Sequence, residues 1–135
     1  MRKVVINAGY GGFSLSYKAM MRYAELKGIK LYAFVNPDFD FKRLVPYDGI
    51  SEAFVIHYAT EPLGEDGKTK RGTYFSNSEI ARDDPILVQV VKELGKEANG
   101  ECATLKIVRI PDDIKWVINE YDGFESIEEE HRSWS

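Results

Sequence analysis

The residues best suited to bind a ligand lie near the N-terminus, in the glycine-rich segment 7–16 with the sequence NAGYGGFSLS. An apolar, β-branched run at residues 2–7 predicts a strand before it, and a helical pattern follows it. A strand, a glycine-rich turn and a helix expose backbone N–H groups at a helix N-terminus, where phosphate binds without a catalytic side chain. The segment therefore suggests a nucleotide-like ligand, with these candidate contacts: Tyr10, Gly11, Gly12 and Phe13.

A structural role for the same glycines is the alternative. Tight turns also need glycine, and Ser14 stands where the dinucleotide-binding fingerprint has its third glycine. Taken by itself, the turn favours the structural interpretation.

A second group of candidate residues surrounds the start of a predicted helix. Tyr74 and Phe75 could stack on an adenine, and Arg82 could bind a phosphate or stack on a base. Asp84 could accept hydrogen bonds from an exocyclic amine or ribose hydroxyls, although it could equally cap the helix. Arg109, on a later strand, is a further candidate cation for the ligand.

Residue combinations typical of catalysis are scarce. His57 and His131 lie apart and match no zinc spacing, and Cys102 begins a predicted strand as a small packed residue. The pairs 83–84 and 112–113, both Asp-Asp, could hold a divalent ion. They are also what a helix start and a turn require. The sequence therefore predicts no catalytic residue, no metal site and no cofactor.

Composition narrows the class of protein. The 135 residues carry 18 basic and 22 acidic side chains, a formal net charge of −4, whereas proteins that bind nucleic-acid polymers normally have a basic balance. The length suits one domain covering residues 1–135. A single cysteine fits a reducing cytoplasm, and no apolar run approaches the length of a membrane span. We therefore expect a cytoplasmic protein whose partners include neither a nucleic-acid polymer nor a membrane.

The elements that would position these residues follow from periodicity. Helical spacing predicts a helix over 15–27, with Ser14 as N-cap and Gly28 as the stop. A strand over 29–35 would lie parallel to the first strand, since strand–helix–strand units of this length form right-handed crossovers. A third strand is expected over 52–59. The polar stretch 60–72 predicts an exposed loop or hairpin tip, either inert or a basic flap over an anionic ligand.

The second half of the chain predicts a helix, a hairpin and a short tail. Asp84 and Pro85 mark the start of the second helix, and Asn99-Gly100 ends this segment after an interruption at Gly95. Strands over 102–110 and 114–120 would form an antiparallel hairpin, and residues 124–135 could form a short acidic helix. The expected fold is α/β: a mixed sheet of about five strands with two main helices and a short C-terminal helix, in the order β-α-β-β-α-β-β-α.

Three segments resemble a known family. They read VVINAGYGGFSLS, RDDPILVQVVKELG and KIVRIPDDIKWVINEYDG followed by EEEHRSW, and together cover about half of the chain. They resemble small phage and prophage proteins that inhibit the Thoeris defence system. The resemblance implies a protein that sequesters the cyclic ADP-ribose signal of bacterial TIR enzymes, or a related cyclic nucleotide, without cleaving it. It also implies a dimer or larger homo-oligomer with pockets shared between subunits.

The resemblance also implies roles for individual residues. In that family an aromatic residue before the second helix stacks on adenine, and a basic residue and an amide lie at the start of the helix. The matching positions are Tyr74 or Phe75, then Arg82, then Asp84. Asp84 departs from the pattern because a carboxylate cannot donate a hydrogen bond as an amide does, which puts the base contact in question.

The leading hypothesis is a nonenzymatic phage protein that binds a cyclic ADP-ribose-type signal in the cytoplasm of an infected or lysogenic bacterium. One alternative is a metal-dependent phosphoesterase that degrades this signal with Asp83, Asp84 or Asp112. Another is an inhibitor that binds a host protein through the loop 60–72 or the acidic tail. Sequence patterns do not separate a signal-binding protein from a protein-binding inhibitor.

Overall fold

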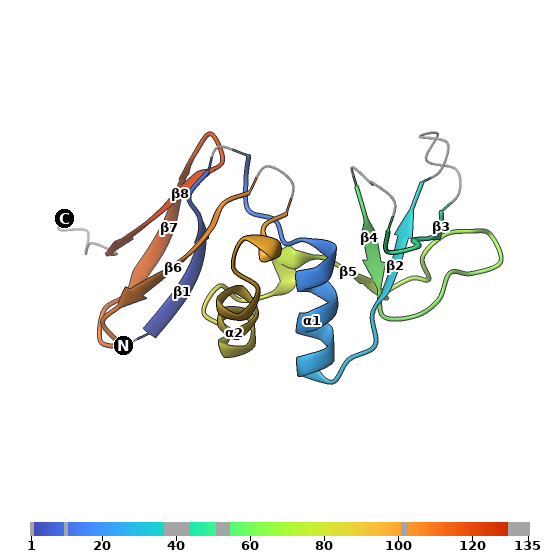
Figure 1. The fold of residues 1–135 in the computed structure, drawn as a ribbon, viewed down its shortest axis with the longest axis horizontal. Helices are drawn as coiled ribbons and strands as arrows, with labels where there is room; N and C mark the ends of the chain where they lie inside the picture. Colours follow the sequence, from blue (N-terminus) through green and yellow to red (C-terminus); the bar gives the residue numbers. More distant parts are fainter. Residues whose placement is uncertain (1, 10, 37–43, 51–54, 101–102, 130–135) are drawn as a thin grey trace, which may run out of the picture.

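The computed structural model describes residues 2–9, 11–36, 44–50, 55–100 and 103–129. Over these residues the protein is mixed α/β, with two α-helices and several antiparallel strands in small sheets (Figure 1). In chain order the elements are β1 (Arg2–Asn7), α1 (Tyr17–Lys27), β2 (Tyr32–Val35), β3 (Val45–Pro46), β4 (His57–Ala59), β5 (Tyr74–Phe75), η1 (Asn77–Glu79), α2 (Pro85–Leu94), η2 (Gly95–Ala98), β6 (Leu105–Ile110), β7 (Trp116–Tyr121) and β8 (Phe124–Glu129).

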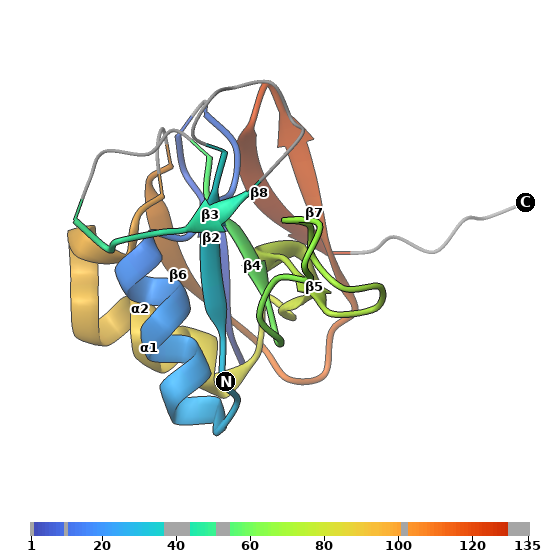
Figure 2. The same cartoon turned by 90° about the vertical axis from the view of Figure 1, so that its right-hand side faces the viewer.

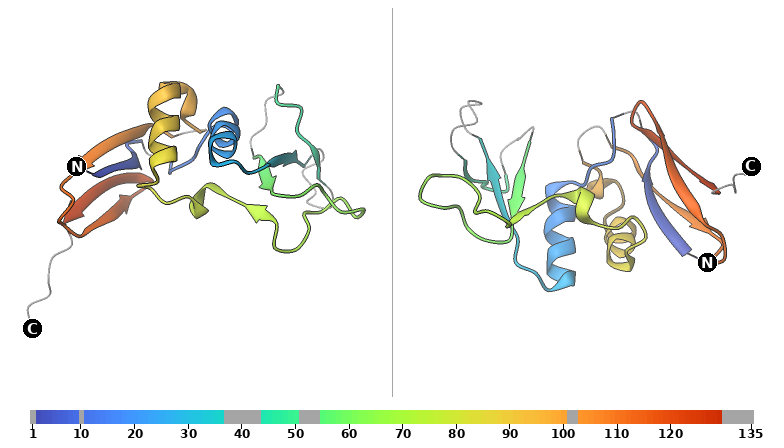
Figure 3. Two further views of the ribbon diagram at one scale, coloured as in Figure 1. Left: turned by 90° about the horizontal axis from the view of Figure 1, so that it is seen from below. Right: turned by 180° about the vertical axis from the view of Figure 1, so that it is seen from behind.

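The strands form two groups with the helices between them. On one side, β1 pairs with β6 and β7 pairs with β8, whereas on the other side the order is β3-β2-β4-β5. Every pairing among these strands is antiparallel. The helices α1 and α2 lie between the two groups in the views from below and behind (Figure 3). They pack side by side, as the view from the side also shows (Figure 2). None of the helices in the described part is long and apolar enough to cross a membrane.

Strand β1 is buried on both faces, which explains its unbroken apolar sequence. Val5 packs in the main core with the inner faces of α1 and α2. Val4 and Ile6 point the other way, into a second core closed by the β7–β8 hairpin. The β1–β6 pair is therefore a layer with helix α2 on one face and the hairpin on the other.

The helix ends agree closely with the local sequence signals. Asp84 caps α2 by accepting a hydrogen bond from the N–H of Ile86, and Pro85 follows it at the first helical position. Gly28 ends α1 with a φ of 77°, in the left-handed region that favours glycine. The expected N-cap of α1 is wrong by two residues: Ser16, not Ser14, accepts the N–H of Ala19.

The predicted parallel pairing of the first two strands is wrong. β1 pairs antiparallel with β6, and β2 lies in the other group of strands. The second edge of β1 is also occupied: the N–H of Val5 donates to the carbonyl of Arg82, and the N–H of Asn7 donates to the Glu125 carboxylate. With both edges engaged, no position beside β1 remains for β2, and the expected single mixed sheet does not form.

The C-terminal prediction is also wrong over the residues that the structure describes. Residues 124–129 form strand β8, which pairs with β7, so the expected hairpin between 102–110 and 114–120 is replaced by one further along the chain. The turn is Asp122-Gly123, with φ values of 54° and 87°. Two left-handed residues are what a tight type I′ hairpin requires. Residues 130–135 of the expected helix lie outside the described residues.

Two strands are shorter than expected, and one loop agrees with its prediction. The expected strands 29–35 and 52–59 narrow to β2 and β4, with 51–54 outside the described residues. The stretch 60–72 joins the antiparallel strands β4 and β5, which confirms a hairpin loop.

Candidate functional site

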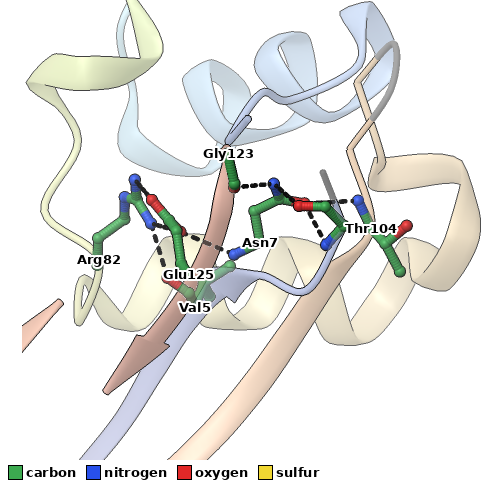
Figure 4. A network of polar contacts seen from close by, with 7 residues as sticks. Val5, Asn7, Arg82, Thr104, Gly123 and Glu125 are labelled. Carbon is green, nitrogen blue, oxygen red and sulfur yellow. Dashed lines mark hydrogen bonds and ion pairs between the residues drawn. The ribbon is translucent and has the colours of Figure 1, made fainter. Parts of the chain in front are cut away.

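A buried asparagine holds the beginning of the glycine-rich turn. Asn7 has 0% of its surface exposed. Its Oδ1 accepts hydrogen bonds from the N–H groups of Gly9 (3.1 Å) and Thr104 (2.8 Å). Its Nδ2 donates to the carbonyl oxygens of Gly9 (2.8 Å) and Gly123 (2.7 Å) (Figure 4). One side chain thus ties the turn to the chain before β6 and to the tip of the β7–β8 hairpin.

Arg82 lies beside this network in an ion pair with Glu125. Its Nη1 and Nη2 lie 2.7 and 2.9 Å from the two carboxylate oxygens, and Nη1 also donates to the Val5 carbonyl at 3.3 Å (Figure 4). The guanidinium carbon stands 3.5 Å above the centre of the Phe13 ring. Arg82 therefore joins β8 and the glycine-rich turn to β1 through its contacts with Glu125, Val5 and Phe13.

The environment of Glu125 favours its charged form. Burial alone would raise the pKa of this carboxyl, but hydrogen bonds from Arg82 and from the Asn7 N–H, together with the guanidinium charge, hold the pKa below its ordinary value of 4.5. The pair is a stabilising contact of the fold.

Asp84 also forms several hydrogen bonds within the fold. Besides capping α2, its Oδ2 accepts hydrogen bonds from the hydroxyl of Tyr23 (2.6 Å) and the ammonium of Lys27 (3.0 Å), both on α1. Burial opposes ionisation, yet these bonds and the N–H of Ile86 keep the pKa of Asp84 below its ordinary value. The residue joins the two helices at one end.

An open cleft of about 540 Å³ lies beside the N-terminal end of α1. Its walls come from the glycine-rich turn, the first turn of α1, the residues around β4 and β5, and the end of η2. The residues that line it are Gly11, Ser14, Leu15, Ser16, Tyr17, Met20, Val55, Ile56, Tyr58, Tyr74, Phe75, Ser76, Asn77, Asn99 and Gly100. The volume lies within the range of small-molecule sites.

The structure brings together three of the residues predicted to bind ligand. Gly11, Tyr74 and Phe75 line the cleft, although the first two lie 63 positions apart in the chain. Tyr74 is 52% exposed, and its ring lies 6.3 Å from that of His57, centre to centre. A planar ligand therefore has an accessible aromatic side chain in the same cleft as the turn.

The other predicted residues lie elsewhere. Phe13 lies under Arg82, and Gly12 provides the turn with a φ of 88°. Arg82 and Asp84 are engaged in the contacts above and do not line the cleft, and Arg109 lies on β6 opposite Lys3. Tyr10 lies outside the described residues.

Sequence patterns missed the polar part of the lining. Ser16, Asn77 and Asn99 reach the cleft from the cap of α1, from η1 and from the end of η2. A signal existed for Ser16, which is followed by the helical pattern of α1 at the correct spacing for an N-cap. Nothing local in the sequence relates Asn77 or Asn99 to the turn.

Backbone hydrogen bonds hold the wall between the turn and α1. The N–H of Gly100 donates to the carbonyl of Ser14 (3.0 Å), and the N–H of Ser16 donates to the carbonyl of Ala98 (3.0 Å). A β-carbon on Gly100 would lie 2.7 Å from the carbonyl carbon of Ser14 and would overlap its hydroxyl. The two segments can be this close only because residue 100 has no side chain.

Gly100→Ala should therefore lower the free energy of unfolding by about 2 kcal/mol, because the added methyl forces two backbones apart. Gly64→Ala is the matched control, since its nearest neighbour is the movable Asp66 carboxylate at 3.1 Å. Urea denaturation followed by circular dichroism measures both variants. Equal stability of Gly100→Ala and Gly64→Ala would show that the backbones at Ser14 and residue 100 can move apart without a cost in stability.

No protein-family model, curated protein or solved structure matches the chain. No group of three or more His, Cys, Asp or Glu side chains among the described residues is placed to hold a metal ion. The resemblance to Thoeris anti-defence proteins stays a prediction, and the proposal that follows depends on the residues of the cleft.

Proposed function

We propose that the protein binds a small nucleotide-like molecule in the cleft beside α1 and holds it without cleaving it. The observation that supports this most is the meeting of the exposed Tyr74 ring with the glycine-rich turn across a cavity of ligand size. Tyr74, the exposed member of the pair, would stack on the base, because an aromatic face binds any nucleobase without needing a particular hydrogen-bond pattern, whereas Phe75 packs against the core.

The polar lining suits the sugar and the phosphates. The amide groups of Asn77 and Asn99 can hydrogen-bond to ribose hydroxyls. Phosphate oxygens would lie at the first turn of α1 and at the backbone of Gly11, where peptide N–H groups and the helix dipole favour negative charge. The described lining residues include no lysine or arginine, so the ligand's charge should be small and spread over several oxygens.

Binding without cleavage follows from the chemistry of the same lining. Its described residues include no carboxylate, histidine, cysteine or lysine, the usual groups that move a proton or attack phosphorus. Serine hydroxyls remain, but Ser16 is engaged as the cap of α1 and as a donor to the Glu97 carbonyl.

The ligand class that we propose is a cyclic ADP-ribose isomer or a related cyclic nucleotide, held by a phage protein that withdraws this signal from a bacterial defence system. A homo-oligomer is part of the proposal, because a base stacked on the half-exposed Tyr74 gains most if a second subunit covers its other face. Sedimentation velocity with and without ligand measures this assembly.

Tyr74→Ala should weaken ligand binding roughly tenfold, because stacking on an aromatic side chain contributes about 1–3 kcal/mol per base. The protein is incubated with cyclic ADP-ribose isomers and filtered, and the retained nucleotide is released by heat and identified. Tyr121→Ala is the matched control, since Tyr121 is 79% exposed on the β7–β8 hairpin and does not line the cleft.

The outcomes separate the proposal from its alternatives. Intact nucleotide released by heat from the wild type, and lost in Tyr74→Ala alone, supports the proposal. Cleaved nucleotide that disappears on adding a chelator indicates a phosphoesterase. Nucleotide that passes the filter unchanged contradicts binding and favours an inhibitor of a host protein, which an affinity pull-down would then test.

A further inference from the structure

Two cations face each other across the β1–β6 pair. The register places Lys3 directly opposite Arg109. Because side chains alternate along a strand, both lie on the same face as Val5, which packs in the core with α2. Like charges directly opposite each other on paired strands destabilise the pair. The two cations therefore lower the stability of the β1–β6 pair, and strand formation itself does not require them at these positions.

A third cation joins them from helix α2. Lys92 and Lys3 line one pocket of about 420 Å³, together with Asp83, Pro85, Val88 and Gln89. The close approach of the Lys92 ammonium, and repulsion from the charges of Lys92 and Arg109, lower the pKa of the Lys3 ammonium from its ordinary value of 10.5. Positive groups from β1, β6 and α2 therefore lie together at one end of the layer that these three elements form.

Four described cations have carboxylate partners, whereas these three, like the exposed Lys68, Lys70 and Arg71, do not. Lys18, Arg22, Lys27 and Arg82 each form an ion pair. Among the described residues, no carboxylate forms an ion pair with Lys3, Lys92 or Arg109. Asp83 is the only acid among the described residues lining the pocket. In a chain with net charge −4, a positive cluster left without counter-ions is what an anionic ligand would neutralise.

We propose that Lys3, Lys92 and Arg109 form an anion site that binds the phosphoryl groups of a small phosphorylated molecule. Two lysines and an arginine can donate several charge-assisted hydrogen bonds to adjacent phosphate oxygens. Pro85 and Val88 give the pocket an apolar wall for the rest of the ligand. The site shares no lining residue with the cleft beside α1, so it is independent of the function proposed for that cleft.

Inorganic pyrophosphate should bind the wild-type protein at physiological ionic strength, and Lys92→Gln should weaken this binding roughly tenfold, the usual loss for one hydrogen bond to a charged group. Isothermal titration calorimetry and phosphorus NMR line widths measure it, with sodium chloride matched for ionic strength. Lys106→Gln is the control: it removes the same charge from an exposed residue on the opposite face of β6 and should leave binding unchanged.

A charge reversal separates a ligand site from a structural contact. Lys92→Glu should abolish pyrophosphate binding, because it replaces a cation of the site by an anion. Failure of the wild type to bind pyrophosphate would overturn the proposal, as would binding that Lys92→Glu leaves unchanged. Binding of single-stranded DNA without binding of pyrophosphate would also overturn it, in favour of a polymer. Tyr74→Ala should not alter pyrophosphate binding, which keeps this test apart from that of the cleft.

Discussion

Asn7→Ala should lower the free energy of unfolding by about 4 kcal/mol, since each buried polar group that loses its partner costs about 1–3 kcal/mol. The alanine removes four hydrogen bonds at once, two to Gly9 and one each to Thr104 and Gly123. Part of the loss is recovered where water reaches the exposed Thr104. The remainder is a large share of the stability of an ordinary domain.

The control for this prediction is an asparagine with the same chemistry and no such contacts. Asn119→Ala changes an exposed residue on β7 and should alter stability by no more than about 0.5 kcal/mol. Urea denaturation monitored by tryptophan fluorescence measures both. If Asn7→Ala lowers the free energy of unfolding by less than about 1 kcal/mol, a water molecule must take over the hydrogen bonds of the amide at little cost.

Asn7→Asp tests whether the network needs the amide specifically. The carboxylate could still accept from Gly9 and Thr104, but it would set a negative oxygen against the carbonyls of Gly9 and Gly123. It would also lie near Glu125, which the Asn7 backbone already contacts. We therefore expect Asn7→Asp to be destabilising too. This result would show that the fold needs the donor nitrogen of the amide as well as its acceptor oxygen.

Arg82→Ala should lower the free energy of unfolding by about 3 kcal/mol, because removing one partner of a buried ion pair leaves the other charge uncompensated. The remaining group is Glu125, whose side chain is 6% exposed. The variant also loses the hydrogen bond to Val5 and the stacking on Phe13. Arg71→Ala, in the exposed loop 60–72, is the matched control and should be nearly neutral.

The pH dependence of this loss has a definite sign. In the wild type the pKa of Glu125 lies below its ordinary value of 4.5, so the unfolded chain takes up the proton first as pH falls. The stability contributed by the carboxylate is therefore present above about pH 4.5 and lost as pH falls through the lowered pKa. Without Arg82, no guanidinium offsets the effect of burial on the Glu125 carboxyl, so this group takes up a proton more readily in the folded variant. The difference in the free energy of unfolding between wild type and Arg82→Ala should therefore shrink from pH 7 to pH 4. A difference that grows toward acid would contradict the role assigned to the pair.

These measurements also bear on the ligand. If Arg82→Ala loses nucleotide retention, the unfolding data decide whether the cause is a lost contact or a disturbed glycine-rich turn, since Phe13 rests against the guanidinium. Only a variant as stable as the wild type would restore Arg82 as a candidate ligand contact.

The local features of this protein could be predicted from its sequence. Asp84 and Pro85 start α2 and Gly28 ends α1, because caps depend on residues within one helical turn of each other. The apolar run of β1 and the loop 60–72 follow from composition alone. The same kind of signal existed for the β7–β8 hairpin, in Asp122-Gly123. The prediction of a helix over 124–135 did not use this turn signal.

Only the tertiary structure decided which edges pair and which side chains meet. Nothing in residues 2–35 excludes a parallel β1–β2 pair; it is excluded because β6, Arg82 and Glu125 occupy both edges of β1. The ion pair that engages Arg82 joins residues 43 positions apart, and the cleft joins Gly11 to Tyr74. Short-range energies fix caps and turns, whereas contacts between distant residues depend on which arrangement of the whole chain buries its apolar faces and satisfies its polar groups.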